Sequence, residues 1–343
     1  MDAHSSNATV QTCFTSISFV RGSPSQAFTI NGIVALVVNG ILAVTGTLVN
    51  SLVILTFWKS PNLRNKTPFF LIMVLSIADL AVGVFVHPLF ILAWTRQLSG
   101  MGDCTSKTAY IVATTLFPSF SAMTQCVINI ERYLAIVHPF VYERRVTKGN
   151  VFVATLFLCS LSTPATITLF FDAKMQNKIL MFNVTAVCLT TIVVYARIYQ
   201  IARQKRRMVP KPSMLSAERS PHERSAASLD CGQTTAAGLD CGQTTAAGKR
   251  EKLRELIKDI KLANTFILIV VCAQVCYFPC AIHNLYVYLN KSPALTVPLM
   301  MTGTWALTFS TIISSLNSLI FFWKNSRLRT EMLRMVRGAW LKA

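Results

Sequence analysis

Seven stretches of the chain meet or approach the length of apolar sequence needed to cross a lipid bilayer. A helix needs about 20 mostly apolar residues to span the hydrocarbon core. The seven windows are 33–57, 68–95, 108–130, 149–171, 179–196, 262–290 and 292–323. Hydrophobic residues make up 52% of the chain and charged residues 14%, which lies outside the range of ordinary soluble domains. The sequence therefore predicts an all-α membrane protein, a bundle of seven spanning helices.

Positive charges indicate which side of the membrane each loop occupies, because lysine and arginine are retained in short cytoplasmic loops. With the N-terminus outside, 27 of the 33 Lys and Arg residues fall in cytoplasmic segments. The other six, Lys107 among them, fall in outer segments. This distribution predicts an extracellular N-terminus. The net charge of +19 then favours attraction to anionic lipid at the inner leaflet over nucleic-acid binding.

Composition divides the chain into five parts. Residues 1–30 form a polar extracellular segment in which we see no cleavable signal peptide. Residues 31–203 hold the first five spans, and 249–323 hold the last two. Between them, 204–248 form a cytoplasmic loop, and 324–343 form the cytoplasmic tail.

The cytoplasmic loop contains a tandem repeat, because residues 229–238 recur at 239–248. Two small, polar, glycine-bearing copies are too few and too short to stack into a repeat architecture, so we interpret the loop as a flexible tether. Metal binding by Cys231 and Cys241 is the alternative. It is disfavoured because no histidine accompanies the two thiols.

The tail has the pattern of an amphipathic helix. Leu328, Met332, Leu333 and Val336 share one helical face among several arginines. This pattern predicts a short helix that lies on the inner membrane surface.

Two features belong to the extracellular side. Only Cys13 and Cys104 are clearly outside the membrane and the cytosol, so a disulfide between them is the one pairing that we propose from the sequence. Asn7, in the triplet Asn-Ala-Thr, is a candidate glycosylation site.

An acid and a base stand side by side at the end of the third window, in the motif Glu131-Arg132-Tyr133 with Pro139 seven residues after the arginine. Together with seven spans and an outer N-terminus, this motif resembles the rhodopsin-like (class A) G-protein-coupled receptors. The resemblance covers about residues 30–338. A purely structural alternative is that Arg132 only extends toward the lipid headgroups.

The resemblance implies an activation switch. In the family, the arginine pairs with its neighbouring acid and with a second acid at the base of helix six, and its release forms the G-protein socket. Asp259, twenty residues before Pro279, stands where that second acid belongs. A kink at Pro279 would turn packing changes near the ligand into movement of the cytoplasmic end. Tyr277 replaces the usual tryptophan of this helix, and Tyr195 matches a family position whose usual hydroxyl partner is missing.

One carboxylate, Asp79, lies inside an apolar window, where a charge costs about 2.5–3.5 kcal/mol on insertion scales. The resemblance implies that Asn50, Ser121 and Asn317 surround it, in a polar cluster that often holds a sodium ion and waters. The alternative is a hydrogen-bonded core without an ion. No other metal and no cofactor is predicted.

The sequence departs from the family pattern in span seven, where residues 317–321 read NSLIF instead of Asn-Pro-x-x-Tyr. The proline kink and the tyrosine hydroxyl are both absent, so we expect a shifted activation equilibrium. The short second outer loop has no cysteine, so the disulfide common in the family cannot form there.

Family positions also indicate candidates for a ligand pocket, although ordinary helix packing is the favoured interpretation of each. They are Thr114, Phe117, Tyr277, His283, Asn284, Trp305 and Phe309. Thr114 stands where amine receptors carry an aspartate, so monoamine ligands are disfavoured.

These features predict a plasma-membrane receptor, not an enzyme, that binds an unidentified extracellular ligand. Helix six would then move outward and the receptor would promote nucleotide exchange on a heterotrimeric G protein, with arrestin and a receptor kinase acting at the third cytoplasmic loop. A transporter or channel is the main rival, disfavoured because the windows hold one acid and no second charge along a path. An intramembrane hydrolase lacks paired catalytic groups. A ligand-independent, constitutively active receptor remains an alternative.

Overall fold

The computed structural model describes residues 9–13, 17–207, 268–269, 271–290 and 296–340. Its elements are β1 (Thr9–Cys13), β2 (Ile17–Arg21), α1 (Gln26–Lys59), α2 (Pro61–Arg64), α3 (Thr67–Ala81), η1 (Val82–Val86), α4 (His87–Leu98), α5 (Cys104–Val137), α6 (Pro139–Arg145), α7 (Lys148–Ser160), α8 (Thr163–Thr168), α9 (Ala173–Arg207), α13 (Val297–Lys324) and α14 (Ser326–Trp340). Residues 271–289 form one more helix, which precedes α13 in the chain.

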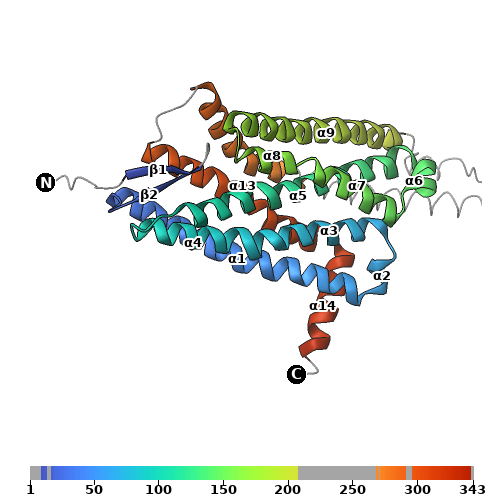
Figure 1. Cartoon of the computed structure of the whole chain (residues 1–343). Coiled ribbons are helices and arrows are strands. Elements are labelled where there is room, and N and C mark those ends of the chain that lie inside the picture. The colour runs from blue at the N-terminus through green and yellow to red at the C-terminus, as the bar shows by residue number, and fades with distance from the viewer. Residues whose placement is uncertain (1–8, 14–16, 208–267, 270, 291–295, 341–343) are drawn as a thin grey trace, which may run out of the picture.

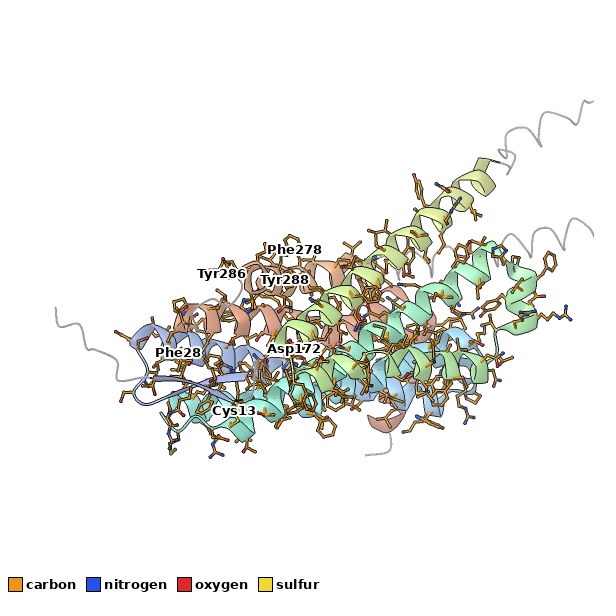
Figure 2. The ribbon with its side chains drawn as sticks, turned by 45° about the horizontal axis from the view of Figure 1, so that its top comes forward. Cys13, Phe28, Asp172, Phe278, Tyr286 and Tyr288 are labelled. Atoms are coloured by element: carbon orange, nitrogen blue, oxygen red, sulfur yellow. A yellow bond between two sulfur atoms is a disulfide. The ribbon has the colours of Figure 1, made fainter. Side chains whose placement is uncertain are left out.

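The long helices pack side by side in an elongated bundle (Figure 1). Among the described residues, six helical segments are long and apolar enough to cross a membrane: α1, Thr67–Leu98, α5, Lys148–Thr168, Lys178–Ile201 and α13. With the helix at 271–289, they account for all seven expected windows. Large apolar side chains cover their outer surface, as Phe278 does in Figure 2, where hydrocarbon can take the place of a protein core. The chain is a multi-pass membrane protein.

Two of the spans contain a change of helix geometry that hydropathy did not predict. The second span passes from α3 through the π-helical turn η1 into α4, which has Pro88 in its first turn. The fourth span breaks between α7 and α8, where Pro164 occupies the first turn of α8. In both places proline withholds an N–H from the helix ladder, so the ladder changes register or ends. At η1 a side chain on Gly83 would come within 2.8 Å of the Thr47 hydroxyl, so only glycine allows α1 this close.

The N-terminal segment contributes to the core instead of remaining a polar extension. β1 and β2 pair as an antiparallel hairpin, and Ile17, Phe19 and Val20 of β2 are buried. The Val20 N–H donates to the Gln97 side chain at 3.2 Å, which anchors the hairpin to the last turn of α4. The hairpin therefore covers the C-terminal end of α4 and the N-terminal end of α5.

A disulfide joins Cys13, the last residue of β1, to Cys104, the first residue of α5, with 5.8 Å between the two Cα atoms. Figure 2 places Cys13 beside that end of the bundle. The remaining cysteines among the described residues are free. Asn7, the glycosylation candidate, lies outside the described residues.

Removing this disulfide should loosen the hairpin and destabilise the end of the bundle that the hairpin covers. Closing a long loop restricts the unfolded chain, and losing such a link typically costs about 2–4 kcal/mol. We expect Cys13→Ser to lower the midpoint of thermal unfolding in detergent or nanodiscs, and mild reduction of the wild-type protein to do the same. Cys159→Ser, at a free cysteine, is the matched control. Equal midpoints for wild type and Cys13→Ser, or two free thiols in unreduced peptides, would contradict the prediction.

The second outer loop is shorter than expected, because α9 begins at Ala173 and not near residue 179. Asp172 starts the helix early, since its side chain accepts from the Met175 N–H at 3.2 Å. This is the geometry of an N-cap. Hydropathy missed these helical turns because their polar residues are compatible with a helix but not with hydrocarbon.

The tail helix forms where it was predicted, but only half of its apolar face packs on the bundle. Leu328 and Met332 are buried, whereas Leu333 and Val336 are exposed. Figure 1 shows α14 projecting away from the bundle axis. The tandem repeat at 229–248 lies outside the described residues.

Candidate functional site

The Glu131-Arg132 pair lies inside the bundle, near the C-terminal end of α5. Each side chain is only 2% exposed. The guanidinium donates to both carboxylate oxygens of Glu131 in a bidentate ion pair. An ion pair this buried is sensitive to change, because removing one partner leaves an uncompensated charge that costs about 3–5 kcal/mol.

A third residue, Tyr142, completes this cluster. Its hydroxyl donates to Glu131 at 2.7 Å from the short loop helix α6, which begins at Pro139 directly after α5 ends. Tyr133, by contrast, turns toward His138, with ring centroids 5.7 Å apart. Sequence reasoning missed Tyr142, because α5 ends at Val137 and the spacing of a continuous helix does not carry over to a residue of α6.

Tyr195 reaches α5 from α9 one turn deeper in the bundle. Its hydroxyl donates to the Asn129 amide oxygen at 3.1 Å, and the Asn129 amide nitrogen donates to Thr191 at 3.1 Å. The sequence predicted that Tyr195 would lack its usual partner, and the structure supplies Asn129 instead. Asp259, the proposed second partner of Arg132, lies outside the described residues.

Asp79 lies at the centre of a second polar cluster and is fully buried. Ser121 of α5 donates to one carboxylate oxygen at 2.6 Å, and Asn317 of α13 donates to the other at 2.9 Å. The carboxylate therefore links three spans. Among the described residues, no basic side chain forms an ion pair with it.

Asn50 belongs to an adjoining network. Its amide nitrogen donates to the Ser314 carbonyl oxygen at 3.1 Å, and its amide oxygen accepts from the Ser318 hydroxyl at 2.5 Å. Ser318 stands where the family has proline, so the departure found in the sequence adds a hydrogen bond between α13 and α1. Ser76 of α3 also lies 3.4 Å from the Ser318 hydroxyl oxygen.

The cluster around Asp79 has the donor set of a small-cation site. Hard cations prefer carboxylate, carbonyl and hydroxyl oxygens. Three buried oxygens, those of the Ser314 and Ser315 hydroxyls and the Asn317 amide, have no hydrogen-bond partner among the described residues. Buried polar atoms of this kind are normally satisfied by protein, water or an ion. The residues present are therefore compatible with a sodium ion.

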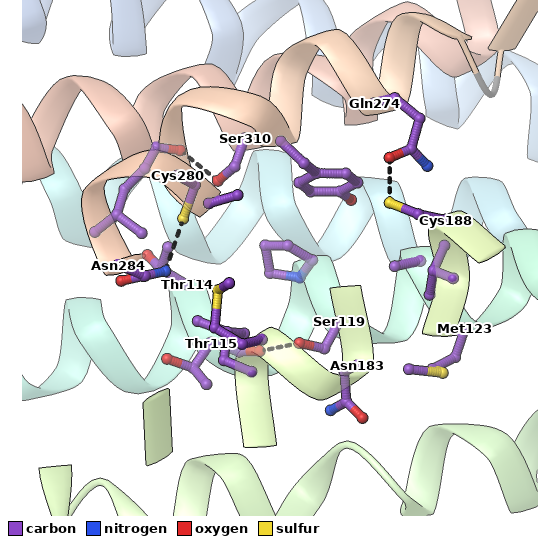
Figure 3. A pocket seen from close by; sticks show the side chains of 18 residues that line it. Thr114, Thr115, Ser119, Met123, Asn183, Cys188, Gln274, Cys280, Asn284 and Ser310 are labelled. Atoms are coloured by element: carbon purple, nitrogen blue, oxygen red, sulfur yellow. Dashed lines mark hydrogen bonds between the residues drawn. The ribbon is translucent and has the colours of Figure 1, made fainter. Parts of the chain in front are cut away.

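A cavity of about 90 Å³ lies between α5, α9, α13 and the helix at 271–289. Figure 3 shows its lining, which is largely apolar with a few polar groups. Thr114, Tyr277 and Asn284, three of the predicted pocket residues, line it. Polar contacts in the wall are internal, since Cys188 donates to Gln274 at 2.5 Å and Asn284 donates to Cys280 at 3.4 Å. An apolar cavity with few polar groups is the usual form of a small-molecule site.

The other four predicted pocket residues do not line this cavity. Phe117 stacks on Phe85 with ring centroids 5.4 Å apart. The ring of His283 contacts Thr302 at 3.3 Å. Trp305 donates to Asn31 at 3.4 Å, and Phe309 is largely exposed. Contacts with neighbouring side chains therefore account for Phe117, His283 and Trp305, whereas Phe309 faces the outer surface.

A third buried polar group, absent from the sequence predictions, lies nearer the extracellular end. The His87 ring nitrogen Nδ1 is 2.8 Å from the Asn39 amide oxygen, and the Asn39 amide nitrogen donates to Thr308 at 3.2 Å. These residues join α1, α4 and α13. The only sequence signal was the presence of polar residues in apolar windows.

The loop between α4 and α5 neutralises its own charges. Asp103 caps α5 by accepting from Ser106 at 2.9 Å, and it forms an ion pair with Arg96 at 2.8 Å. Partial burial acts to raise the pKa of Asp103, but the Ser106 hydrogen bonds and the Arg96 charge outweigh it and hold that pKa below its usual value. Arg96 therefore already has a carboxylate partner.

Part of this chain is similar to known membrane receptors. The model of the 7-transmembrane receptors of the rhodopsin family matches residues 49–179. The chain is 31% identical to a D(1C) dopamine receptor of Xenopus laevis, over 33% of this chain and 24% of that protein. It is 35% identical to the adenosine receptor A2a of Cavia porcellus, over 31% of this chain and 25% of that protein. An alpha-2A adrenergic receptor of Danio rerio is 30% identical over 51% of this chain and 49% of that protein. The matches thus span between about a quarter and a half of these relatives.

Proposed function

We propose that this chain, part of which matches the model of the rhodopsin family of seven-transmembrane receptors, is a plasma-membrane receptor that promotes nucleotide exchange on a heterotrimeric G protein. Its N-terminus would face the extracellular space. The observation that supports the proposal most is the buried Glu131-Arg132 pair at the end of α5.

The pair supports a switch because it lies where helices meet. A bidentate ion pair at a packing seam has two discrete arrangements, paired or released, and a ligand or a protein partner can favour either. Tyr142 ties the pair to the loop helix α6, and Tyr195 ties the preceding turn to α9. Movement of the cytoplasmic ends of these helices would therefore change the position of Arg132. In this proposal, outward movement of helix six exposes Arg132 to the G protein.

The ligand would enter the cavity beside Thr114, Tyr277 and Asn284. Although relatives carry the names of dopamine and adrenergic receptors, Thr114 offers no charge to a protonated amine. We therefore do not extend those ligands to this chain. A sodium ion, if bound, would be held by Asp79 with oxygens of Ser121 and Asn317, and it would supply the positive charge that this carboxylate lacks.

The cytoplasmic partners follow from the same proposal. Arrestin and a receptor kinase would act at the third cytoplasmic loop, which lies outside the described residues. The exposed apolar side chains Leu333 and Val336, among the arginines of α14, suit contact with an anionic membrane surface. A constitutively active receptor is the second candidate, favoured by the replacement of proline with Ser318 in α13.

Nucleotide exchange tests the proposal directly. The full chain in nanodiscs with purified G-protein heterotrimers should accelerate guanine-nucleotide exchange above receptor-free nanodiscs, either basally or with a compound from a ligand library. A constitutive receptor would do so without any compound. No acceleration with any of the main G-protein classes and any ligand would argue against a receptor that couples to G proteins.

Asp259 offers a sharper test of the switch. If Asp259 restrains Arg132 at rest, Asp259→Ala should raise basal exchange several-fold, because the paired state loses one of its stabilising contacts. Glu251→Ala, at another acid of the same cytoplasmic segment, is the control and should leave basal exchange unchanged. An unchanged basal rate in Asp259→Ala would eliminate the restraint by Asp259 without affecting the rest of the proposal.

A further inference from the structure

Among the described residues, the buried cation Lys107 forms no ion pair with a carboxylate; it lies at the end of the bundle that carries the β1–β2 hairpin. It is 8% exposed and lies in the first turn of α5. No described acid forms an ion pair with it, and the nearest loop acid, Asp103, is paired with Arg96. Buried lysines are rare and are normally paired, because an uncompensated charge loses its hydration. The helix dipole adds to the cost, since the first turn of a helix carries partial positive charge.

Aromatic rings surround the Lys107 ammonium group. It lies 5.4 Å from the Trp94 ring centroid and 5.7 Å from that of Tyr110. Trp94 also stacks on Phe28, at 5.2 Å, and on Phe90, at 5.8 Å. Cation–π attraction offsets part of the burial of the charge, about 0.5–2 kcal/mol. It supplies no hydrogen-bond acceptor, however, and an ammonium group has three donors.

A buried donor without a described partner lies close to the Lys107 ammonium group. Trp94 is 1% exposed, and its indole Nε1 has no hydrogen-bond partner among the described residues. Buried indole N–H groups usually find an acceptor. The side chains of Trp94 and Lys107 therefore bring two kinds of hydrogen-bond donor together at a buried position, and neither has a described acceptor.

We propose that Lys107 and the indole N–H of Trp94 together bind the carboxylate group of an extracellular ligand. This proposal assigns a class of ligand to the proposed receptor, and it rests on that proposed function. A carboxylate has two acceptor oxygens, and charge-assisted hydrogen bonds of about 2.8 Å allow it to bridge donors several ångströms apart. One lysine balances one negative charge. A phosphate dianion would leave a net charge buried, which makes it the weaker ligand.

The position suits the end of a longer ligand. Lys107 and Thr114 are seven residues apart on α5, which places them on one face about 10 Å apart along the helix. Thr114 is part of the cavity wall. A ligand of that length with its carboxylate at Lys107 would place its apolar body at the cavity. Access would be from the extracellular end, where the hairpin β1–β2 is tied to α5 by the disulfide.

The indole N–H of Trp94 gives a direct measurement that needs no G protein. The full chain, with its five tryptophans ¹⁵N-labelled in nanodiscs, would be titrated with acetate, and Trp94→Phe would assign the resonance. Acetate should move the Trp94 indole proton downfield to saturation, as expected when the donor gains an acceptor. Acetamide, a neutral probe of the same shape, should not. Inorganic phosphate should bind more weakly than acetate.

Variants at Lys107 then separate binding from packing. Lys107→Met keeps the length of the side chain and removes the charge, so we expect acetate to bind about tenfold to hundredfold more weakly. Lys107→Arg should stay within a few-fold of wild type. Unchanged resonances of the other four indoles would show that each variant is folded. If Lys107→Met does not fold, the comparison of acetate with acetamide, in wild type and in Lys107→Arg, still tests the proposal.

Three results would overturn the proposal: no shift with acetate, an equal shift with acetamide, or an unchanged acetate affinity in Lys107→Met. Tighter binding of phosphate than of acetate would also overturn the assignment to a singly charged ligand. Because the measurement contains no G protein, a negative result would leave the exchange activity untouched. A receptor that binds acetate but fails to promote exchange would instead contradict the proposed function alone.

Discussion

Replacing Arg132 with alanine should reduce receptor-promoted nucleotide exchange at least tenfold, which is among the largest effects that we expect from a single substitution. The guanidinium would be lost from the surface offered to the G protein. Among the described residues, Glu131 would then keep the Tyr142 hydroxyl as its one side-chain donor while it remains buried. The measurement is exchange on purified heterotrimers, with the amount of folded receptor in nanodiscs determined separately.

A substitution of the partner residue, Glu131, distinguishes an effect on signalling from an effect on stability. Glu131→Gln keeps the shape of the side chain but removes its charge, so Arg132 should leave the paired arrangement more often and basal exchange should rise several-fold. Destabilisation alone would lower exchange in both variants. Arg334→Ala breaks an exposed ion pair with Glu331 on α14, which is worth about 0–1 kcal/mol, and serves as the control. A fall in exchange in both Arg132→Ala and Glu131→Gln would reduce the pair to a structural element.

The second large effect concerns sodium and Asp79. If an ion binds there, replacing choline with sodium at constant ionic strength should raise the thermal unfolding midpoint of the wild-type protein. At a concentration 100 times the dissociation constant, a ligand that binds only the folded state stabilises it by about 2.7 kcal/mol. We expect Asp79→Asn to lose this increment, because a neutral amide cannot balance the charge of the ion.

Two substitutions of Asp79 distinguish stabilisation by a bound ion from stabilisation by the hydrogen bonds of the carboxylate. Asp79→Asn can still accept a hydrogen bond from Ser121 or Asn317, whereas Asp79→Ala leaves both donors buried without their acceptor, at about 1–3 kcal/mol for each. Asp172→Asn, in the outer loop, is the control, since asparagine caps a helix as well as aspartate does. A sodium-dependent increment that survives in Asp79→Asn, or one that is absent from wild type, would favour a hydrogen-bonded core without an ion.

The spans and their number were predictable because lipid imposes a simple requirement. Each crossing needs a minimum length of apolar sequence, so windows such as 33–57 and 108–130 appear as α1 and α5. The ends of the helices were less accurate. α9 starts at Ala173 because Asp172 caps it, and a cap is a local hydrogen bond that a hydropathy window does not register.

The residues of the cytoplasmic site were predictable only in part. Resemblance to a family identified Glu131 and Arg132, and burial at 2% exposure is consistent with a role inside the bundle. It did not identify Tyr142 or Asn129, which became partners because a loop helix and a neighbouring span bring them within 2.7–3.1 Å. The pocket candidates show the same division. Thr114, Tyr277 and Asn284 line the cavity, whereas Phe117 and Trp305 pack against other helices.

The sequence by itself determined the membrane class, the apolar windows and the resemblance to a receptor family, because apolar length and short motifs are properties of the chain that no packing can alter. Only the tertiary structure decided which polar groups meet. The Asn50–Ser318 hydrogen bond joins residues 268 positions apart, and the Lys107 ammonium and the Trp94 indole, which has no described hydrogen-bond partner, come from different helices. The physical reason is that a hydrogen bond or a buried charge depends on distances of a few ångströms between helices, and those distances are set by the packing of every side chain at once.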